Sequence, residues 1–404
     1  MVTAATRQNT GTRQGGSIMI DVEKVRRDTP ACERVTHLNN AGAALAPQPV
    51  VDALTGHIEL EATIGGYEAA ERAAASVERF YPAVAELIGA RPDEIAYVEN
   101  ATRAWDLAFF AIPFRRGDRI LTTTSEYASN GIAFRQVAQR HGVRVDVVPD
   151  DEHGQISVDA LAVELERGDV RLVAVNHVPT HNGLVNPAAD IGRLCRAAGV
   201  LFLLDACQSV GQLAVDVAEV QCDMLSATGR KFLRGPRGTG FLYVRRDVVS
   251  DLEPPMLDLV SATWTSPDTY EIRSDARRFE NFERNMAGQI ALGVAADYAS
   301  ALGIEVIEQR VTRLAADLRE RLTATPGVAV RDRGAQRCGI VAFTVDGSEP
   351  EQVRDMLRGR GINVSVTHGS ELYDRNALPR AVRASVHYYN TENELDRLVN
   401  ALAP

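Results

Sequence analysis

Short apolar runs alternate with amphipathic stretches through the middle of the chain, from about residue 95 to residue 245. Four runs of mostly aliphatic residues predict buried strands, at 119–124, 143–148, 171–176 and 200–205. The stretches between them repeat apolar residues at helical spacing, at 128–141, 157–166 and 187–198. This alternation predicts an α/β fold, with a parallel sheet covered by helices on both faces. Ligands of such sheets bind beyond the carboxyl ends of the strands, so residues that directly follow a strand are the candidates for chemistry.

A second pattern begins near residue 300 and predicts a smaller α+β domain. Its predicted elements are a long amphipathic helix at 306–324, a strand at 339–345, a helix at 349–358 and a strand at 383–389. We therefore expect a large domain over residues 46–295 and a small domain over residues 296–404. Residues 19–45 are expected to pack on the small domain. Residues 1–18 are rich in Thr, Gln, Gly and Arg, and we expect a disordered tail there.

Composition narrows the class of protein. The chain has 404 residues, of which 45% are hydrophobic and 24% charged, as in ordinary globular proteins. Its formal net charge of −10 disfavours nucleic acid or an anionic membrane as the partner. No apolar run is long enough to span a bilayer, and the first residues lack the apolar core of a secretory signal. The five cysteines are scattered and never in CxxC spacing, which predicts a cytoplasmic protein without a metal site.

Lysine is almost absent from this chain, and its position is therefore informative. Of the 44 Lys and Arg residues, only Lys24 and Lys231 are lysine. Arginine cannot lose its proton near neutral pH or condense with an aldehyde to a Schiff base, whereas lysine can do both. Lys231 lies between a polar run and a Gly-rich turn, a context that suggests covalent chemistry. A surface lysine that escaped the compositional bias is the alternative.

A carboxylate ends one of the predicted strands, in the sequence Leu204-Asp205-Ala206. A buried carboxylate is costly unless it meets a positive partner. A cap or turn aspartate is the common explanation, and a partner for the protonated pyridine nitrogen of a cofactor is the functional one. Lys231 follows after one more helix and strand, so Asp205 and Lys231 can reach the same crevice at the strand ends.

Several motifs together resemble one enzyme family. Asp205-x-x-Gln208 and Thr228-Gly-Arg-Lys231, followed by Gly235-Pro-x-Gly-x-Gly240, look like the class V branch of the fold-type I pyridoxal-phosphate enzymes. That branch includes cysteine desulfurases, isopenicillin N epimerases and hercynylcysteine sulfoxide lyases. The resemblance runs from about residue 38 to residue 394. It implies a large, mainly parallel seven-stranded sheet domain, a smaller α+β domain, and pyridoxal phosphate as cofactor.

The resemblance also assigns residues to the cofactor. Lys231 would hold pyridoxal phosphate as a Schiff base and move the Cα proton of the substrate. Tyr127 would stack on the ring, where desulfurases carry His, and it is counted as catalytic together with Lys231. Asp205 would pair with the ring nitrogen. The ring hydroxyl would be bound by Gln208 with Thr180 or His181, and the phosphate by Ala101, Thr102, Thr228 and Arg230.

For the substrate, the resemblance implies a small amino acid whose α-carboxylate pairs with Arg383. Asn40, Ala41 and Tyr67 complete the predicted substrate site. The family's active sites form between two subunits, so we expect a homodimer. A carboxylate, Glu283, follows Phe282 at the segment that reaches the partner's phosphate in desulfurases, and Arg284 is a possible substitute for that contact.

Two features favour a C–S lyase over a persulfide-forming desulfurase. Desulfurases need a thiolate near residues 361–370, and this chain has no cysteine after Cys338. The segment 64–72 and the Arg230-Lys231 pair resemble hercynylcysteine sulfoxide lyases. We therefore expect β-elimination from a cysteine S-conjugate or its sulfoxide, giving pyruvate and ammonia. A trimethylammonium-bearing substrate would favour aromatic faces, for which the candidates are Tyr67, Trp105, Trp264, Tyr270 and Tyr373.

Other reactions of the same scaffold stay open. Decarboxylation coupled to oxidative deamination of a cysteine S-conjugate, aminotransfer and epimerisation all use the same cofactor residues. A non-catalytic regulator that binds pyridoxal phosphate is an alternative from a different class. The acidic chain, which shows no DNA-binding segment, disfavours it.

Overall fold

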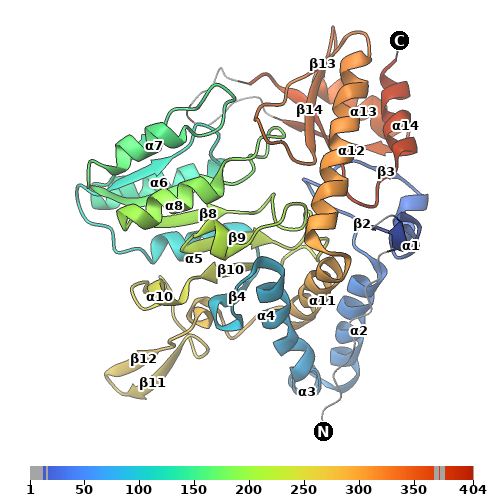
Figure 1. Ribbon diagram of the computed structural model, residues 1–404. Coiled ribbons are helices and arrows are strands. Elements are labelled where there is room, and N and C mark those ends of the chain that lie inside the picture. Colours follow the sequence, from blue (N-terminus) through green and yellow to red (C-terminus); the bar gives the residue numbers. More distant parts are fainter. Residues whose placement is uncertain (1–11, 15–16, 368–372, 374–377, 404) are drawn as a thin grey trace.

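A computed structural model describes residues 12–14, 17–367, 373 and 378–403 (Figure 1). Its large sheet has seven strands in the order β4-β10-β9-β8-β7-β5-β6. The strands are β4 (Ile95–Val98), β5 (Arg119–Thr122), β6 (Arg144–Val147), β7 (Val170–Asn176), β8 (Leu201–Asp205), β9 (Met224–Thr228) and β10 (Gly240–Val244). Strands β5 to β9 pair in parallel, and β10 runs antiparallel to both of its neighbours. The predicted α/β fold with a mainly parallel sheet is confirmed.

Helices cover both faces of this sheet. The helices that follow its strands are α5 (Ala101–Phe110), α6 (Ala128–His141), α7 (Val158–Leu165), α8 (Ala188–Ala198), α9 (Val217–Val220) and α10 (Arg246–Val249). Side chains alternate between the two faces along a strand. In β7, Leu172 belongs to the core cluster shared with α5 and α6, whereas Val173 belongs to the cluster shared with α7 and α8. Both faces of the sheet are therefore buried, which explains the continuous apolar runs.

The C-terminal part of the chain folds around a second, four-stranded sheet of order β13-β14-β17-β16. Its elements are α12 (Ile304–Ala324), β13 (Val328–Val330), β14 (Ile340–Val345), α13 (Pro350–Gly359), β16 (Ser365–Thr367), β17 (Ala381–Ser385) and α14 (Glu392–Leu402). The strand predicted at 383–389 begins earlier and ends at Ser385. It ends there because a turn follows, in which the Asn390 side chain accepts a hydrogen bond from the backbone N–H of His387 at 2.8 Å.

The N-terminal segment is joined to the C-terminal part through its backbone. After α1 (Val22–Arg27) and the 3-10 turn η1 (Pro30–Glu33), strand β3 (Thr36–His37) pairs in parallel with β15 (Ile362–Asn363). Most of the tail predicted to be disordered, residues 1–11 and 15–16, lies outside the described residues. Its described part forms a short antiparallel pair, β1 (Thr12–Gln14) with β2 (Ser17–Met19).

A group of long helices forms the lower part of the molecule in Figure 1. It consists of α2 (Gln48–Ile64), α3 (Gly66–Arg72), α4 (Ala74–Ile88) and α11 (Met286–Leu302), with η2 (Pro92–Glu94) leading into β4. Beside it a hairpin of β11 (Ala262–Ser266) and β12 (Thr269–Ile272) projects from the body, and η3 (Ala276–Phe279) follows it. Within the described part of the chain, no single helix is long and apolar enough to cross a membrane. Only the pair α11–α12, bent by 80°, passes that test jointly.

Arg234 ties the Gly-rich turn after Lys231 to two other parts of the chain. It is a buried non-glycine residue with a left-handed backbone, φ 62°. Its guanidinium donates to the Leu45 carbonyl at 2.7 Å, to the Tyr388 hydroxyl at 2.8 Å and to the Thr29 hydroxyl at 2.6 Å. A strained backbone persists only where its surroundings fix it. These three contacts hold the turn, and with it Lys231, against the N-terminal and C-terminal segments.

Candidate active site

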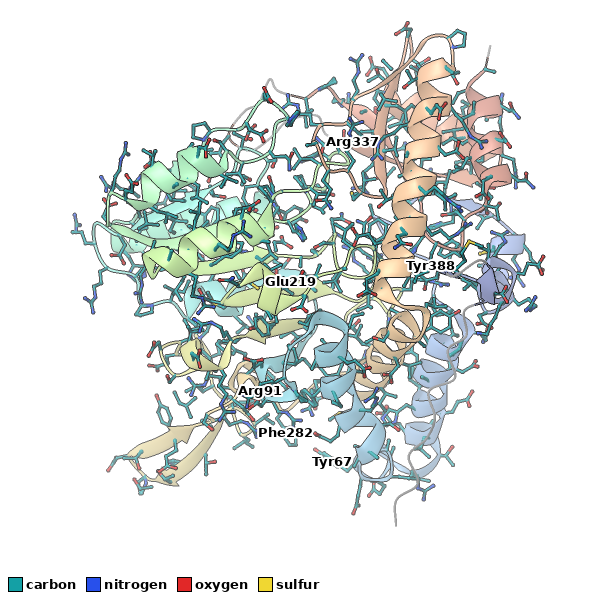
Figure 2. The ribbon with its side chains drawn as sticks, viewed as in Figure 1. Tyr67, Arg91, Glu219, Phe282, Arg337 and Tyr388 are labelled. Atoms are coloured by element: carbon teal, nitrogen blue, oxygen red, sulfur yellow. The ribbon has the colours of Figure 1, made fainter. Side chains whose placement is uncertain are left out.

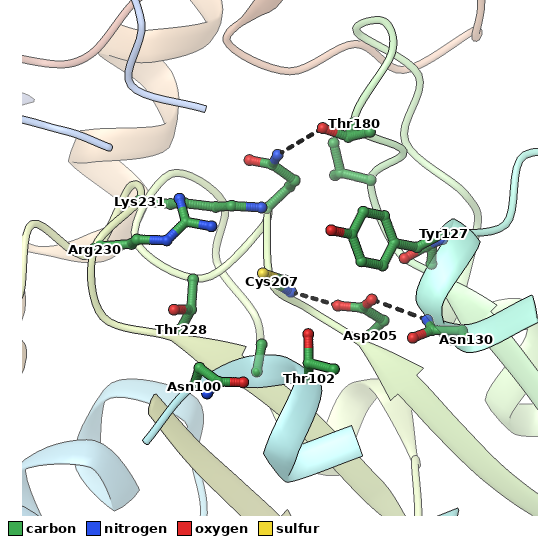
Figure 3. A pocket seen from close by; sticks show the side chains of 14 residues that line it. Asn100, Thr102, Tyr127, Asn130, Thr180, Asp205, Cys207, Thr228, Arg230 and Lys231 are labelled. Atoms are coloured by element: carbon green, nitrogen blue, oxygen red, sulfur yellow. Dashed lines mark hydrogen bonds between the residues drawn. The ribbon is translucent and has the colours of Figure 1, made fainter. Parts of the chain in front are cut away.

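One cavity lies beyond the carboxyl ends of β7, β8 and β9, where the strand-end rule predicts a ligand (Figure 3). Its lining is mostly polar and combines residues from five separate stretches of the chain. The lining residues are Asn100, Ala101, Thr102, Tyr127, Asn130, Asn176, Val178, Thr180, Asp205, Cys207, Gln208, Thr228, Arg230 and Lys231.

The N-terminus of α5 forms the floor of the cavity in Figure 3. Asn100 caps this helix, and its side chain accepts a hydrogen bond from the Arg103 backbone N–H at 2.9 Å. Glycine at position 240 lets β10 pass close to the cap, because a Cβ there would lie 2.6 Å from the Ala227 carbonyl oxygen and 3.0 Å from the Asn100 carbonyl carbon. The first N–H groups of a helix lack partners inside the helix and carry its positive end. The backbone N–H groups of Ala101 and Thr102 therefore suit an anionic group of a ligand.

Asp205 ends β8 and faces the cavity from its buried position. Its Oδ1 accepts from the Cys207 backbone N–H at 3.0 Å, and its Oδ2 accepts from the Asn130 side-chain amide at 3.1 Å. Burial raises the pKa of Asp205, while these hydrogen bonds and the positive charge of Lys231 lower it. A carboxylate in this position suits a cationic nitrogen of a ligand.

Gln208, Thr180 and Arg383 form a chain of contacts along the opposite wall. The Gln208 amide donates to the Thr180 hydroxyl at 3.2 Å and to the Ala41 carbonyl at 3.1 Å. Arg383 lies behind Thr180 and donates to its hydroxyl at 2.7 Å and to its carbonyl at 2.8 Å. Burial, and then the like charge of Arg230, lower the pKa of Arg383 to about 10. A carboxylate ligand would offset that desolvation.

Two cations and a thiol meet beside the helix start. Lys231 and Arg230 follow β9 directly, and both side chains reach into the cavity in Figure 3. The Arg230 guanidinium also donates to the Gly42 carbonyl. Burial raises the pKa of the Cys207 thiol, whereas the charge of Lys231 and its hydrogen bond to this thiol lower it. Lys231 is thus a buried amine in a polar cavity, as a Schiff-base lysine requires.

Comparison with known proteins identifies the family. The family model of aminotransferase class-V matches residues 36–398. The chain belongs to the class V aminotransferase family. A probable cysteine desulfurase of Methanothermobacter thermautotrophicus is 32% identical over 394 residues, covering 95% of this chain and 98% of the relative. A cysteine desulfurase of Salmonella gallinarum is 31% identical over 408 residues, covering 94% and 97%. The apo structure of a cysteine desulfurase from Thermococcus onnurineus superposes with a TM-score of 0.88 at 28% identity, covering 96% of this chain and 98% of that one.

These relatives contradict the reaction predicted from the sequence. A β-eliminating C–S lyase was expected and a desulfurase disfavoured, yet the relatives that match nearly the whole chain bear the name cysteine desulfurase. That prediction was wrong because it rested on one missing loop cysteine and two short segments, whereas the desulfurases match this chain over nearly its whole length. The expectation of a class V, fold-type I enzyme is confirmed, whereas a particular likeness to hercynylcysteine sulfoxide lyases is not.

Pyridoxal phosphate, the expected cofactor of this family member, fits the residues of the cavity. The start of α5 suits its phosphate, together with the hydroxyls of Thr102 and Thr228. Asp205 suits its ring nitrogen, and Lys231 suits its aldehyde. The side-chain oxygen of Gln208 is buried without a hydrogen-bond partner among the described residues, and the ring hydroxyl would supply one. The aromatic ring of Tyr127 stands in the same space, at the N-cap of α6.

The remaining predicted residues lie around the cavity or away from it. Asn40 is buried and donates to the Ser385 carbonyl at 2.7 Å, while Ala41 reaches the cavity wall through Gln208. His181 follows Thr180 but is not among the residues that line the cavity. Tyr67 is 79% exposed on α3, at the lower end of the molecule in Figure 2, so within one chain it does not line the cavity.

The aromatic residues proposed for a trimethylammonium group are scattered as well. Trp105 is buried in the core, stacked on Phe109 with ring centroids 4.5 Å apart. Trp264 and Tyr270 are exposed on the β11–β12 hairpin. Tyr373 lies beside Arg135, and its neighbours at 368–372 and 374–377 fall outside the described residues. No aromatic cage is therefore assembled from these five among the described residues.

Five lining residues were missed by the sequence reasoning: Asn100, Asn130, Asn176, Val178 and Cys207. Position alone could have indicated some of them. Asn176 ends β7, and Cys207 lies two residues after the end of β8, so both obey the strand-end rule. Asn130 carried no such signal, because it lies inside α6 and reaches the cavity only through the packing of that helix against the sheet.

Proposed function

We propose that this protein is a pyridoxal-phosphate enzyme that removes the sulfur atom of cysteine and transfers it to a thiol. The observation that carries the proposal is the similarity of nearly the whole chain to proteins named cysteine desulfurase, joined with a cavity that fits the cofactor. The balanced reaction converts cysteine and a thiol into alanine and a persulfide. When bound, pyridoxal phosphate supplies an electron sink for the bonds at Cα.

Three residues at the cavity would have separate roles toward the substrate and the cofactor. Arg383 would hold the α-carboxylate, since it is buried beside Thr180 and its Nε has no hydrogen-bond partner among the described residues. Lys231 would take the proton from Cα and return a proton at the end of the reaction. Tyr127 would cover the open face of the cofactor ring.

The acceptor thiol is where this chain departs from the pattern that desulfurases set. Its sequence has no cysteine beyond Cys338. Cys32, Cys195, Cys222 and Cys338 are buried, and Cys207 alone among the five lines the cavity. Cys207 lies between Asp205 and Lys231, under the space for the cofactor, and burial keeps its thiol protonated. We therefore propose that the sulfur acceptor is a separate thiol that enters the cavity.

Alanine is the product that tests the proposal. The purified protein, loaded with pyridoxal phosphate, is incubated with L-cysteine in the presence and absence of dithiothreitol, and alanine, sulfide and pyruvate are measured. We expect alanine and sulfide in equal amounts, and only when the added thiol is present. Pyruvate in place of alanine, or no turnover of cysteine, would exclude desulfuration.

Matched variants separate the chemistry from general effects. Lys231→Ala should lower alanine formation by about 10²–10⁴-fold, the usual contribution of a positioned acid–base group. Lys24→Ala is the control, because Lys24 is the other lysine of the chain and pairs with Asp28 on the surface. Cys207→Ala should keep the turnover that depends on the added thiol. If this variant loses that turnover, Cys207 is the sulfur acceptor.

We also propose that the enzyme is a homodimer. Trp264 and Tyr270 are directly opposite each other in the β11–β12 hairpin, and their side chains are 75% and 55% exposed. An isolated two-stranded hairpin with exposed aromatic residues is marginal in water. Phe282, 47% exposed, lies near this hairpin in Figure 2. A second copy of the chain that packs on this region would bury these aromatic side chains.

A further inference from the structure

A second buried carboxyl group lies behind Asp205. Glu126 immediately precedes Tyr127 and is only 2% exposed. Its Oε1 accepts from the Tyr127 backbone N–H at 2.7 Å, from the Asn130 amide at 2.9 Å and from the Asn176 amide at 2.6 Å. Its Oε2 is 2.9 Å from the Thr122 hydroxyl. Four donors from β5, β7 and α6 thus fix the orientation of this side chain.

The side chain of Asn130 links this carboxyl to the cavity. The same amide nitrogen lies 2.9 Å from Oε1 of Glu126 and 3.1 Å from Oδ2 of Asp205. Figure 3 shows Asn130 beside Asp205, at the side of the cavity from which Tyr127 projects. The amide therefore lies between two carboxyl groups, and the position of each one limits that of the other.

The charges around Glu126 determine how it ionises. Burial, and then the charge of Asp205, raise the pKa of Glu126 to about 8. The charge of Glu126 raises the pKa of the nearby Tyr373 hydroxyl. The guanidinium carbon of Arg135 lies 5.9 Å from the centre of the Tyr373 ring. On the cavity side, the positive charge of Lys231 lowers the pKa of Asp205. His177 follows Asn176 on the same strand end and is buried. Glu126 thus faces the carboxylate of Asp205 with no cation in direct contact among the described residues.

We propose that Glu126 is a positioning residue for the cofactor: through Asn130 it fixes the Asp205 carboxylate, and its ionisation sets the pH at which the bound cofactor changes its protonation state. A negative charge on Glu126 would stabilise a protonated cofactor bound in the adjacent cavity. The inference concerns the cofactor and does not depend on cysteine as the substrate. It is therefore tested without turnover.

The test is a spectroscopic titration of the loaded protein without substrate. The visible absorption of the Schiff base is followed from about pH 6 to about pH 10, around the pKa of Glu126, near 8. Glu126→Gln keeps the hydrogen bonds, since its amide oxygen can accept from Asn130 and Asn176 and its amide nitrogen can donate to Thr122. We expect its titration midpoint to fall by on the order of one pH unit, because one negative charge near the cofactor is lost.

Two controls and one independent variant complete the test. Glu280→Gln changes another buried carboxyl group, which follows η3 and accepts from the Tyr81 hydroxyl and the Tyr97 backbone N–H, and it should leave the midpoint unchanged. Glu126→Asp keeps the charge and should restore a midpoint near that of the unchanged protein. Asn176→Ala removes a donor to Glu126 and should shift the midpoint in the same direction as Glu126→Gln, by less. If Glu126→Gln fails to fold, the titration midpoint of Asn176→Ala tests the proposal in its place.

Binding of the cofactor gives a second readout. Glu126→Ala should weaken the affinity of the apo protein for pyridoxal phosphate by roughly tenfold, because Asn130 loses the partner that orients it. Glu126→Gln should retain the affinity within about threefold. Unchanged midpoints in Glu126→Gln and Asn176→Ala, whatever their thermal stability, would overturn the proposal and leave Glu126 a structural residue only.

Discussion

At the scale of single residues, the cavity depends on polar groups that are buried and oriented by others. Asp205 accepts from Cys207 and Asn130, and Gln208 is held by Thr180 and Ala41. Buried polar groups of this kind are costly unless each finds a partner. The side-chain oxygen of Gln208 has no partner among the described residues, and the ring hydroxyl of the cofactor would provide one.

His177 predicts a pH dependence of stability at this scale. Burial lowers its pKa to about 4, and its Nδ1 has no hydrogen-bond partner among the described residues. Between pH 4 and the ordinary value of 6.5, the unfolded chain binds a proton at this residue that the folded protein does not. The free energy of unfolding should therefore decrease as the pH falls through this range, by up to about 3 kcal/mol from this one residue.

Urea unfolding at a series of pH values measures this contribution. His177→Gln should flatten the decrease in stability between about pH 6.5 and about pH 4.5, because the titrating imidazole is gone. His141→Gln, at the exposed end of α6, is the control and should leave the slope unchanged. An identical slope in all three proteins would show that His177 is not buried as a neutral group.

At the scale of secondary structure, the phosphate site depends on how closely β10 approaches the start of α5. Gly240→Ala would place a methyl group 2.6 Å from the Ala227 carbonyl oxygen and 3.0 Å from the Asn100 carbonyl carbon. These are backbone atoms, so α5 or β10 must move. We expect a loss of about 1–3 kcal/mol in unfolding free energy and a weaker affinity for pyridoxal phosphate, since the helix start is displaced.

Thermal unfolding and cofactor titration of the same variant measure both effects. Gly359→Ala, at the end of α13, is the matched control because a Cβ there meets no atom within 4 Å. It should be neutral or slightly stabilising, as alanine is favoured over glycine in helices. Normal cofactor affinity in Gly240→Ala would show that the helix start is not the phosphate site.

At the scale of the whole molecule, the proposed dimer follows from what one chain leaves exposed. Light scattering coupled to size exclusion should give twice the 43.9 kDa mass of one chain. The double variant Trp264→Ser, Tyr270→Ser should weaken association at least about tenfold, because the loss of two interface aromatics of this size usually costs more than 1 kcal/mol. Val163→Ser, at an exposed apolar residue of α7, is the control and should stay dimeric. A monomeric unchanged protein would contradict the proposal.

The sequence by itself determined the layered α/β architecture and the family. Both follow from local signals: apolar runs of strand length, helical periodicity between them, and short motifs such as Asp205-x-x-Gln208 and the stretch around Lys231. Those signals are encoded within a few residues of each other, so they can be recognised without knowledge of the packing. The helices and strands after residue 300 were predicted in the same way, but β17 begins earlier than predicted and ends at Ser385, before the turn at His387 to Asn390.

Tertiary structure alone decided which distant residues meet. Arg383 lies beside Thr180 across 203 positions of the chain, and Asn130 lies between Glu126 and Asp205 because the start of α6 meets the end of β8. Tyr67, expected at the substrate site, is exposed on α3 and does not line the cavity within one chain. Such contacts depend on the packing of whole elements, which no local pattern records. The reaction could not be derived from one missing cysteine for the same reason, since a catalytic site is defined by residues brought together in space.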